Sequence, residues 1–318
     1  MATSTKQASH AEKRPVSRAS IIVAFAAVYF FWGSTYTAIR IGSADMPALL
    51  FAGMRFLIAG LILMGWCRFR GLRIYWPRRE MTIFCAVGLL LLGGGNVGLV
   101  YAERTMPSGL SSLVLAVIPL MVALIEMLLP GGEPLPARGW LGMGLGFAGL
   151  VALVWPSMEA GVTGDRALLL ALIALLGGAV CWAVGSVLSR RARLKANSFV
   201  AAAWQMIFAG VFSVGLGSAM GEWPEFHLTA GAVGSLAYLI TGGSLIGYTA
   251  FIYLLEHVPV GKVVSHSYIN PVVAVILGIL VLGERPEVAE FVGMAGVIVA
   301  VYLLTSARMG RGAERASE

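Results

Sequence analysis

Long apolar runs, separated by short polar or Pro/Gly-rich segments, make up most of this 318-residue chain. A membrane-spanning helix needs about 20 mostly apolar residues. Runs of roughly this length predict ten transmembrane helices, at 20–41, 48–67, 82–102, 109–129, 138–155, 167–189, 198–219, 230–254, 262–282 and 288–306. We therefore expect an all-α integral membrane protein with little room for a domain outside the bilayer.

The amino-acid composition supports a lipid environment for these helices. Hydrophobic residues make up 58% of the chain and charged residues only 12%, whereas a soluble domain has about 25% charged residues. The net charge of +7 lies in short loops and tails, so we predict no nucleic-acid partner. The three cysteines form no CxxC motif or Cys/His cluster, and we predict no metal and no cofactor.

The distribution of Lys and Arg predicts the orientation, because cytoplasmic loops of membrane proteins are enriched in these residues. With the N-terminus in the cytoplasm, 18 basic residues fall on the cytoplasmic side and four, Arg40, Arg104, Arg166 and Arg285, on the other. The remaining one, Arg55, lies within a span. We expect both termini, as short tails at 1–19 and 307–318, to be cytoplasmic.

The second part of the chain repeats the first. Residues 99–119 read LVYAERTMPSGLSSLVLAVIP, and residues 251–271 read FIYLLEHVPVGKVVSHSYINP. An offset of 152 superimposes Tyr101 on Tyr253, Pro107 on Pro259, Gly109 on Gly261 and Pro119 on Pro271. Near the start of each half, an offset of 150 aligns Trp32 with Trp182 and Arg55 with Gln205.

Each repeat holds five predicted spans, at 20–156 and at 167–306. Because five is an odd number, the second repeat must enter the membrane upside down relative to the first. Inverted repeats are typical of secondary transporters, whose solute site lies near the midplane between the halves and opens to each side in turn. The repeat therefore predicts a transporter that works by alternating access.

At these motifs the sequence resembles the EamA family of the drug/metabolite transporter superfamily, over about 20–306. The residues that carry the resemblance are Phe31-Trp32-Gly33-Ser34-Thr35, Arg55-Phe56, Ala59, Pro107, Gly109, Ser112, Pro119, Gly132-Glu133, Trp204-Gln205, Pro259-Val260-Gly261, Pro271 and Leu282-Gly283-Glu284. The resemblance implies a ten-helix carrier, and its nearest match is to YddG-type exporters of aromatic and other neutral amino acids. We expect a carrier of the inner membrane whose partners are a small solute, an amino acid first, and the lipid bilayer; the oligomeric state is open.

Polar and aromatic side chains inside spans are candidates for the solute site, because burying them in hydrocarbon is unfavourable unless they are paired or face a cavity. The predicted substrate-binding residues are Trp32, Tyr36, Asn96, Tyr101, Trp182, Trp204, Gln205, Tyr248 and Asn270. The amides can hold an amino or carboxyl group, and the rings can surround an apolar side chain. Interhelical hydrogen bonding and packing are the alternatives for each residue.

Three further residues inside spans are candidates for structural, carboxylate-binding or hinge roles. Arg55 is the only basic residue deep in a span. We interpret it first as a structural residue that bonds helix-end carbonyls or Glu126, and second as a ligand for a substrate carboxylate. Pro119 and Pro271 lie near the middle of spans four and nine, where each removes a backbone hydrogen bond, and they are candidates for gating hinges or for fixed kinks.

Other functions stay open: a carrier of another metabolite, such as a nucleobase or sugar derivative, an integral-membrane enzyme acting on lipids, or a scaffold. An enzyme needs clustered acid/base or metal-ligating groups, and the one candidate, Glu284, Glu287 and Glu290, fits a solvated helix start. No Asp or Glu lies at mid-depth in a span, and His266 fits an interhelical histidine. The sequence therefore argues against proton antiport of cationic drugs, and it favours facilitated movement down a gradient or coupling through a group that it does not identify.

Overall fold

The computed structural model of the chain describes residues 17–131 and 166–285, together with scattered residues between 137 and 151 and between 291 and 299. Within these residues all regular structure is helical. Seven helical segments are long and apolar enough to cross a membrane: Arg18–Ser43, Ala48–Phe69, Arg78–Glu103, Ser108–Leu128, Arg166–Arg191, Ser198–Ala219 and Ala230–His257. They coincide with seven expected spans, whereas spans 138–155 and 288–306 lie largely outside the described residues.

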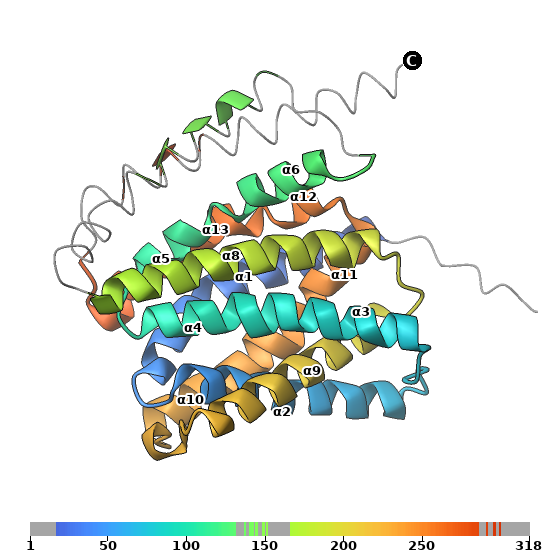
Figure 1. The fold of residues 1–318 in the computed structure, drawn as a ribbon, viewed down its shortest axis with the longest axis horizontal. Helices are drawn as coiled ribbons and strands as arrows, with labels where there is room; N and C mark the ends of the chain where they lie inside the picture. The colour runs from blue at the N-terminus through green and yellow to red at the C-terminus, as the bar shows by residue number, and fades with distance from the viewer. Residues whose placement is uncertain are drawn as a thin grey trace, which may run out of the picture.

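Several spans consist of more than one helical piece (Figure 1). In the first half the helices are α1 (Arg18–Ser43), α2 (Ala48–Phe69), α3 (Arg78–Gly88), the π-helical segment η1 (Leu89–Asn96), α4 (Val97–Glu103), α5 (Ser108–Leu115) and α6 (Ile118–Leu128). In the second half they are α8 (Arg166–Arg191), α9 (Ser198–Ala219), the short η2 (Trp223–Glu225), α10 (Ala230–Tyr238), η3 (Leu239–Tyr248), α11 (Thr249–His257), α12 (Val260–Val263), α13 (His266–Leu277) and η4 (Gly278–Leu282).

Helices α2 and α9 hold the two halves together along their whole length. A Cβ atom on Gly53 of α2 would lie 2.7 Å from the backbone nitrogen of Val214 in α9, and one on Gly60 would lie 2.9 Å from that of Ile207. The contact positions advance along α2 as they recede along α9, so these two helices run antiparallel. Such close approach of backbones requires small residues at the interface.

The internal repeat of the sequence is also visible in local structure. The π-helical segments η1 and η3 begin at Leu89 and Leu239, which are 150 residues apart. Arg40, near the end of α1, donates a hydrogen bond to the carbonyl of Glu103, and Arg190, near the end of α8, donates one to the carbonyl of Glu256 at 2.8 Å. Equivalent positions of the halves thus make equivalent contacts.

The fourth and ninth spans are interrupted near the two prolines singled out in the sequence. Helices α5 and α6 are separated at Ala116 and Val117, just before Pro119, while α12 and α13 are separated at Val264 and Ser265 and Pro271 lies inside α13. A proline nitrogen cannot donate the hydrogen bond of a regular helix. The interruptions supply positions where these spans could bend, and a gating role for them stays a prediction.

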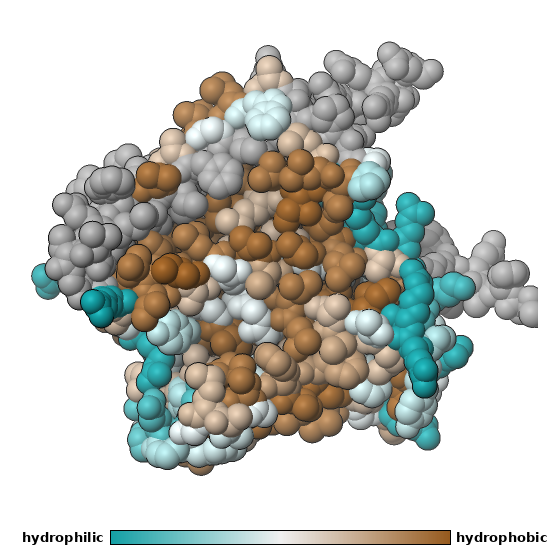
Figure 2. All heavy atoms as spheres, in the orientation of Figure 1, coloured by the Kyte–Doolittle hydropathy of each residue, from teal (hydrophilic) through white to brown (hydrophobic). Residues whose placement is uncertain are grey.

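The surface of the helical bundle is sorted by polarity. Figure 2 shows an apolar band across the middle of the visible face, with hydrophilic residues gathered at its left and right edges. Large apolar side chains such as Leu61, Ile62, Val211 and Phe212 are exposed. A water-facing surface rarely carries so large a contiguous apolar area, so this band fits contact with lipid chains.

Candidate solute cavity

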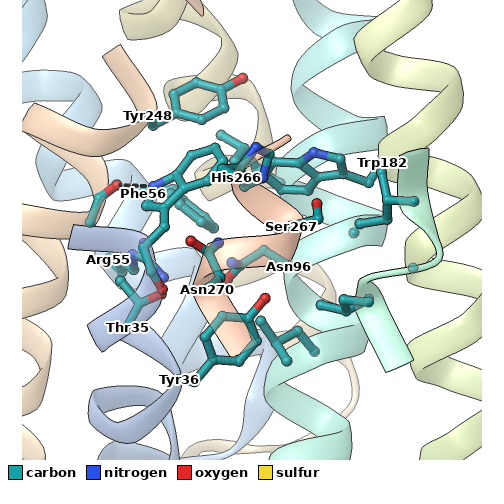
Figure 3. Close-up of a pocket in the computed structure, with 18 residues that line it drawn as sticks. Thr35, Tyr36, Arg55, Phe56, Asn96, Trp182, Tyr248, His266, Ser267 and Asn270 are labelled. Carbon is teal, nitrogen blue, oxygen red and sulfur yellow. Dashed lines mark hydrogen bonds between the residues drawn. The ribbon is translucent and has the colours of Figure 1, made fainter. Parts of the chain in front are cut away.

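A cavity lies in the interior of the bundle, between the two halves (Figure 3). Its wall is built from α1, α2, η1, α4, α5 and α6 of the first half and from α8, η3 and α13 of the second. Its volume is about 50 Å³, on a scale where one water molecule needs about 10–15 Å³. The space is therefore narrow, and a larger solute requires the wall to move outward.

The cavity collects six of the nine predicted substrate-binding residues, from helices that are far apart in the sequence. These are Trp32, Tyr36, Asn96, Trp182, Tyr248 and Asn270, and Arg55 lines the same space. In the view of Figure 3, the amides of Asn96 and Asn270 lie between Arg55 and Trp182. A cationic group, two amides and aromatic rings thus surround one space.

Trp32 is the centre of the aromatic part of the wall. Its ring lies 5.3 Å from that of Trp182 in an edge contact, 4.8 Å from that of Phe251 and 5.0 Å from that of His266. Its indole nitrogen donates a hydrogen bond of 3.0 Å to the carbonyl of Gly243 in η3. This bond and the edge contacts hold the indole in one orientation. The aromatic wall is therefore preformed.

Arg55 reaches the cavity from α2 and is only 4% exposed. Its Nε donates a hydrogen bond of 2.9 Å to the hydroxyl of Ser244, and its guanidinium carbon lies 4.8 Å from the centre of the Phe56 ring. Glu126, one of the partners considered from the sequence, instead pairs with Arg191 at 3.2 Å. Among the described residues no carboxylate forms an ion pair with Arg55, which makes this buried cation available to an anionic group.

The two amides supply acceptors beside this cation. Asn96 is 9% exposed and Asn270 is 2% exposed, and both line the cavity. The Oδ1 atom of each has no hydrogen-bond partner within the described residues. Because a buried polar atom without a partner is unfavourable, these oxygens are sites where a solute can donate hydrogen bonds.

Three predicted residues lie elsewhere. Gln205 is fully buried behind the cavity, where its Oε1 accepts a hydrogen bond of 2.7 Å from the Tyr248 hydroxyl, and it lines a second cavity of about 400 Å³. Trp204 donates to the carbonyl of Ile74 at 2.8 Å. Tyr101 is 40% exposed. Trp204 and Tyr101 do not line the central cavity.

The structure adds residues to the cavity that the sequence had not singled out for it. Thr35, Phe56, Gly243 and Ser267 line it, and so does His266, which contacts Trp32 of α1 from α13. Thr35 was accessible to sequence reasoning, since a residue three positions after Trp32 lies on the same helix face. The others depend on how separate spans pack.

A bundle of membrane-length apolar helices, arranged in two related halves around a polar and aromatic cavity, defines an integral-membrane transporter. The chain belongs to the EamA-like transporter family, whose sequence model matches it twice, at residues 19–155 and 169–306. The two matches agree with the repeat read from the sequence. Membership of this family confirms a multi-pass membrane transporter and argues against a lipid-modifying enzyme.

Individual relatives extend over most of the chain. The inner membrane transporter YedA of Escherichia coli K12, described as uncharacterized, is 34% identical over 280 residues and 88% of each chain. A probable amino-acid metabolite efflux pump of the same organism is 25% identical over 301 residues, covering 87% of this chain and 91% of its own. A solved crystal structure shares the fold, with a TM-score of 0.68 and 21% sequence identity. The match covers 91% of this chain and 99% of the other chain.

Proposed function

We propose that this transporter exports neutral and aromatic amino acids across the inner membrane by alternating access. The observation that carries the proposal is the combination of groups in the cavity. The Arg55 guanidinium has no carboxylate partner among the described residues, the carbonyl oxygens of Asn96 and Asn270 have no hydrogen-bond partner among them, and aromatic rings surround Trp32. A zwitterion with an apolar side chain is complementary to all three.

The two charged ends of an amino acid match the two polar parts of the wall. A guanidinium binds a carboxylate through two parallel hydrogen bonds, which are stronger than bonds between neutral groups. The α-ammonium group has only donors, and the Oδ1 atoms of Asn96 and Asn270 are acceptors without partners among the described residues. The carboxylate and ammonium groups of the solute would therefore supply partners for buried polar groups of the cavity wall.

The rest of the wall selects a neutral side chain. Arg55 is the only charged residue among the described residues that line the cavity. A solute with a second carboxylate or ammonium group would bury that charge without an opposite partner, which costs several kcal/mol. Phe56, Trp182 and Tyr248 offer apolar surface instead, which favours aromatic and large aliphatic side chains.

Relatives and topology support the remaining parts of the proposal. The names of two relatives refer to amino-acid metabolite efflux and to the inner membrane. The antiparallel contact of α2 with α9 is what two inverted halves require. Ten spans with both termini in the cytoplasm complete the proposed arrangement, in which the halves move against each other and Pro119 and Pro271 allow their spans to bend.

Efflux from proteoliposomes tests the substrate class. Vesicles containing the purified protein are loaded with labelled phenylalanine, leucine, glutamate or lysine, and the loss of label is followed with and without a pH gradient. We expect phenylalanine and leucine to leave and glutamate and lysine to be retained. If the wild-type protein moves no neutral amino acid under any gradient, the proposal is refuted.

Matched tryptophan variants test the site. Trp182→Ala removes part of the cavity wall and should reduce phenylalanine transport by roughly 10- to 100-fold, because burying a large apolar side chain contributes about 1.5–3 kcal/mol. Trp223→Ala is the control, since Trp223 is exposed and lies outside the cavity. Equal transport by the two variants at equal membrane levels would remove the aromatic wall from the site.

A further inference from the structure

Glu103 is a buried acidic residue that has no role in the proposed solute site. It is the last residue of α4 and is 0% exposed. Neither oxygen of its carboxyl group has a hydrogen-bond partner within the described residues. Its place at the end of the third span distinguishes it from the exposed acids of the loops, such as Glu225.

The charged neighbours of Glu103 form no hydrogen bond or ion pair with its carboxyl group. Arg40 donates a hydrogen bond to the backbone carbonyl of Glu103, and its positive charge attracts an ionised carboxylate there, but its guanidinium forms no ion pair with that carboxylate. Arg104 pairs with Glu225 at 3.4 Å. Glu284, the other charged group near enough to act on Glu103, is an acid itself and would repel a negative charge there.

Glu284 is occupied by a structural task. Its carboxylate accepts hydrogen bonds of 2.9 Å and 3.3 Å from the backbone nitrogens of Ser108 and Gly109, and of 2.9 Å and 3.0 Å from the Ser108 hydroxyl. It therefore caps the start of α5, where the helix dipole favours negative charge.

An ionised Glu103 would be very unfavourable in these surroundings. A buried charge without a hydrogen-bonding partner of opposite sign loses its hydration and recovers little in return, and such groups become neutral instead. A carboxylic acid carries no net charge and leaves only the smaller penalty of a buried polar group. The environment of Glu103 thus favours the protonated form.

Glu103 also lies next to the cavity. Leu99, one helical turn earlier on α4 and therefore on the same face, lines the cavity, and Tyr36 lines it and is close enough to Glu103 to feel its charge. Glu284 comes from the second half of the chain. The carboxyl group therefore lies where the two halves meet. It is at the end of the cavity that faces away from the cytoplasm in the orientation predicted from the distribution of Lys and Arg.

We propose that Glu103 is a proton-binding site that links transport to protons. In the conformation of the structure the carboxyl group holds the proton. When the halves part at this end, water reaches the group, and the proton passes from the carboxyl oxygen to water and leaves a hydrated carboxylate. Closing this end again requires a proton to return from water. The link to transport depends on the proposed alternating access, whereas the proton site itself does not.

Infrared difference spectroscopy tests the proton site without any solute. Wild-type protein in lipid vesicles is titrated from mildly alkaline to acidic pH, and the carbonyl-stretching band of protonated carboxyl groups is recorded. We expect a band that is lost in Glu103→Gln and kept in Glu225→Gln, whose side chain is 65% exposed. A band that Glu103→Gln leaves unchanged overturns the proposal.

Stability supplies a second, independent result. Gln has the shape and neutrality of a protonated Glu, so Glu103→Gln should unfold within a few degrees of the wild-type protein. A variant that fails to fold or melts far lower would show that the native group is an ionised carboxylate held by Arg40, and the proposal would be wrong.

Transport measurements test whether the proton site at Glu103 is linked to the movement of the solute. In vesicles that move phenylalanine, a pH gradient should change the rate for the wild-type protein and for Glu225→Gln but have no effect on Glu103→Gln. A pH response that survives in Glu103→Gln overturns the link. If the wild-type protein moves no amino acid, the proposed substrate class fails, and the infrared band alone decides the proton site.

Discussion

Replacing Gly243 with Ala tests whether the position of Arg55 matters for the solute. Gly243 lies in η3, and a Cβ atom there would stand 2.5 Å from Arg55 Nη2 and 2.9 Å from the Thr35 methyl group. Ordinary van der Waals contact begins at 3.4 Å, so the guanidinium must retreat by about 0.9 Å. It is a flexible side-chain end and can do so, but only by leaving its present position in the cavity wall.

The expected effect follows from the bonds that this displacement breaks. A hydrogen bond to a charged group contributes about 1.5–3 kcal/mol, and each 1.4 kcal/mol changes a binding constant about tenfold. If Arg55 binds the solute carboxylate, losing one such bond should weaken phenylalanine binding by roughly 10- to 100-fold. Folding should survive, because Ala is a better helix former than Gly by about 1 kcal/mol.

Equilibrium binding of labelled phenylalanine to the purified protein, followed by efflux from proteoliposomes, measures this effect. Gly65→Ala is the control, since a Cβ atom on this exposed residue of α2 meets nothing within 4 Å. Wild-type affinity in Gly243→Ala would refute the reasoning and return Arg55 to a purely structural role. A loss shared equally by both variants would show a general effect of added methyl groups.

Three further changes test other parts of the structure by thermal or chemical unfolding in detergent. Tyr248→Phe removes the hydroxyl that donates a hydrogen bond to the Gln205 amide oxygen and should lower the free energy of unfolding by about 1–3 kcal/mol. Glu284→Ala removes the cap from Ser108 at the start of α5 and should lower it by about 0.5–2 kcal/mol. Gly210→Ala places a Cβ atom 2.5 Å from a backbone nitrogen of α2, which cannot move aside like a side chain, and should reduce the yield of folded protein.

Each of these three changes has a control in the same chain. Tyr101→Phe alters an exposed hydroxyl, and Glu225→Ala breaks an exposed ion pair worth about 0–1 kcal/mol. Gly215→Ala adds a methyl group that meets nothing within 4 Å. A variant that behaves like its control would show that the contact it removes or crowds contributes little to stability.

The spans were predictable because their signal is local. Span length and polarity are properties of consecutive residues, and seven of the expected spans coincide with described helices. The repeat was equally accessible, since its matched residues survive in both halves, and the family model matches each half once. Trp32 and Trp182, aligned by that repeat, meet at 5.3 Å in the cavity wall.

Glu103 shows how much depends on the exact end of a span. The third span was expected to end at about 102, and the helix ends one residue later, at Glu103, which is completely buried. Helix ends are uncertain by a few residues in any prediction from a pattern. For a charged residue at a span end, that uncertainty separates a hydrated surface group from a buried one.

The sequence by itself determined that the protein is a membrane transporter with repeated halves, because hydrophobic length and internal similarity do not depend on packing. Only the tertiary structure decided which deep residues share the cavity. Trp182 and Trp204 look alike in the sequence, yet one faces the cavity and the other donates to Ile74. These helices are apolar on every side, so no amphipathic stripe marks the inner face, and the side that faces the cavity is set by the neighbouring helices from both halves.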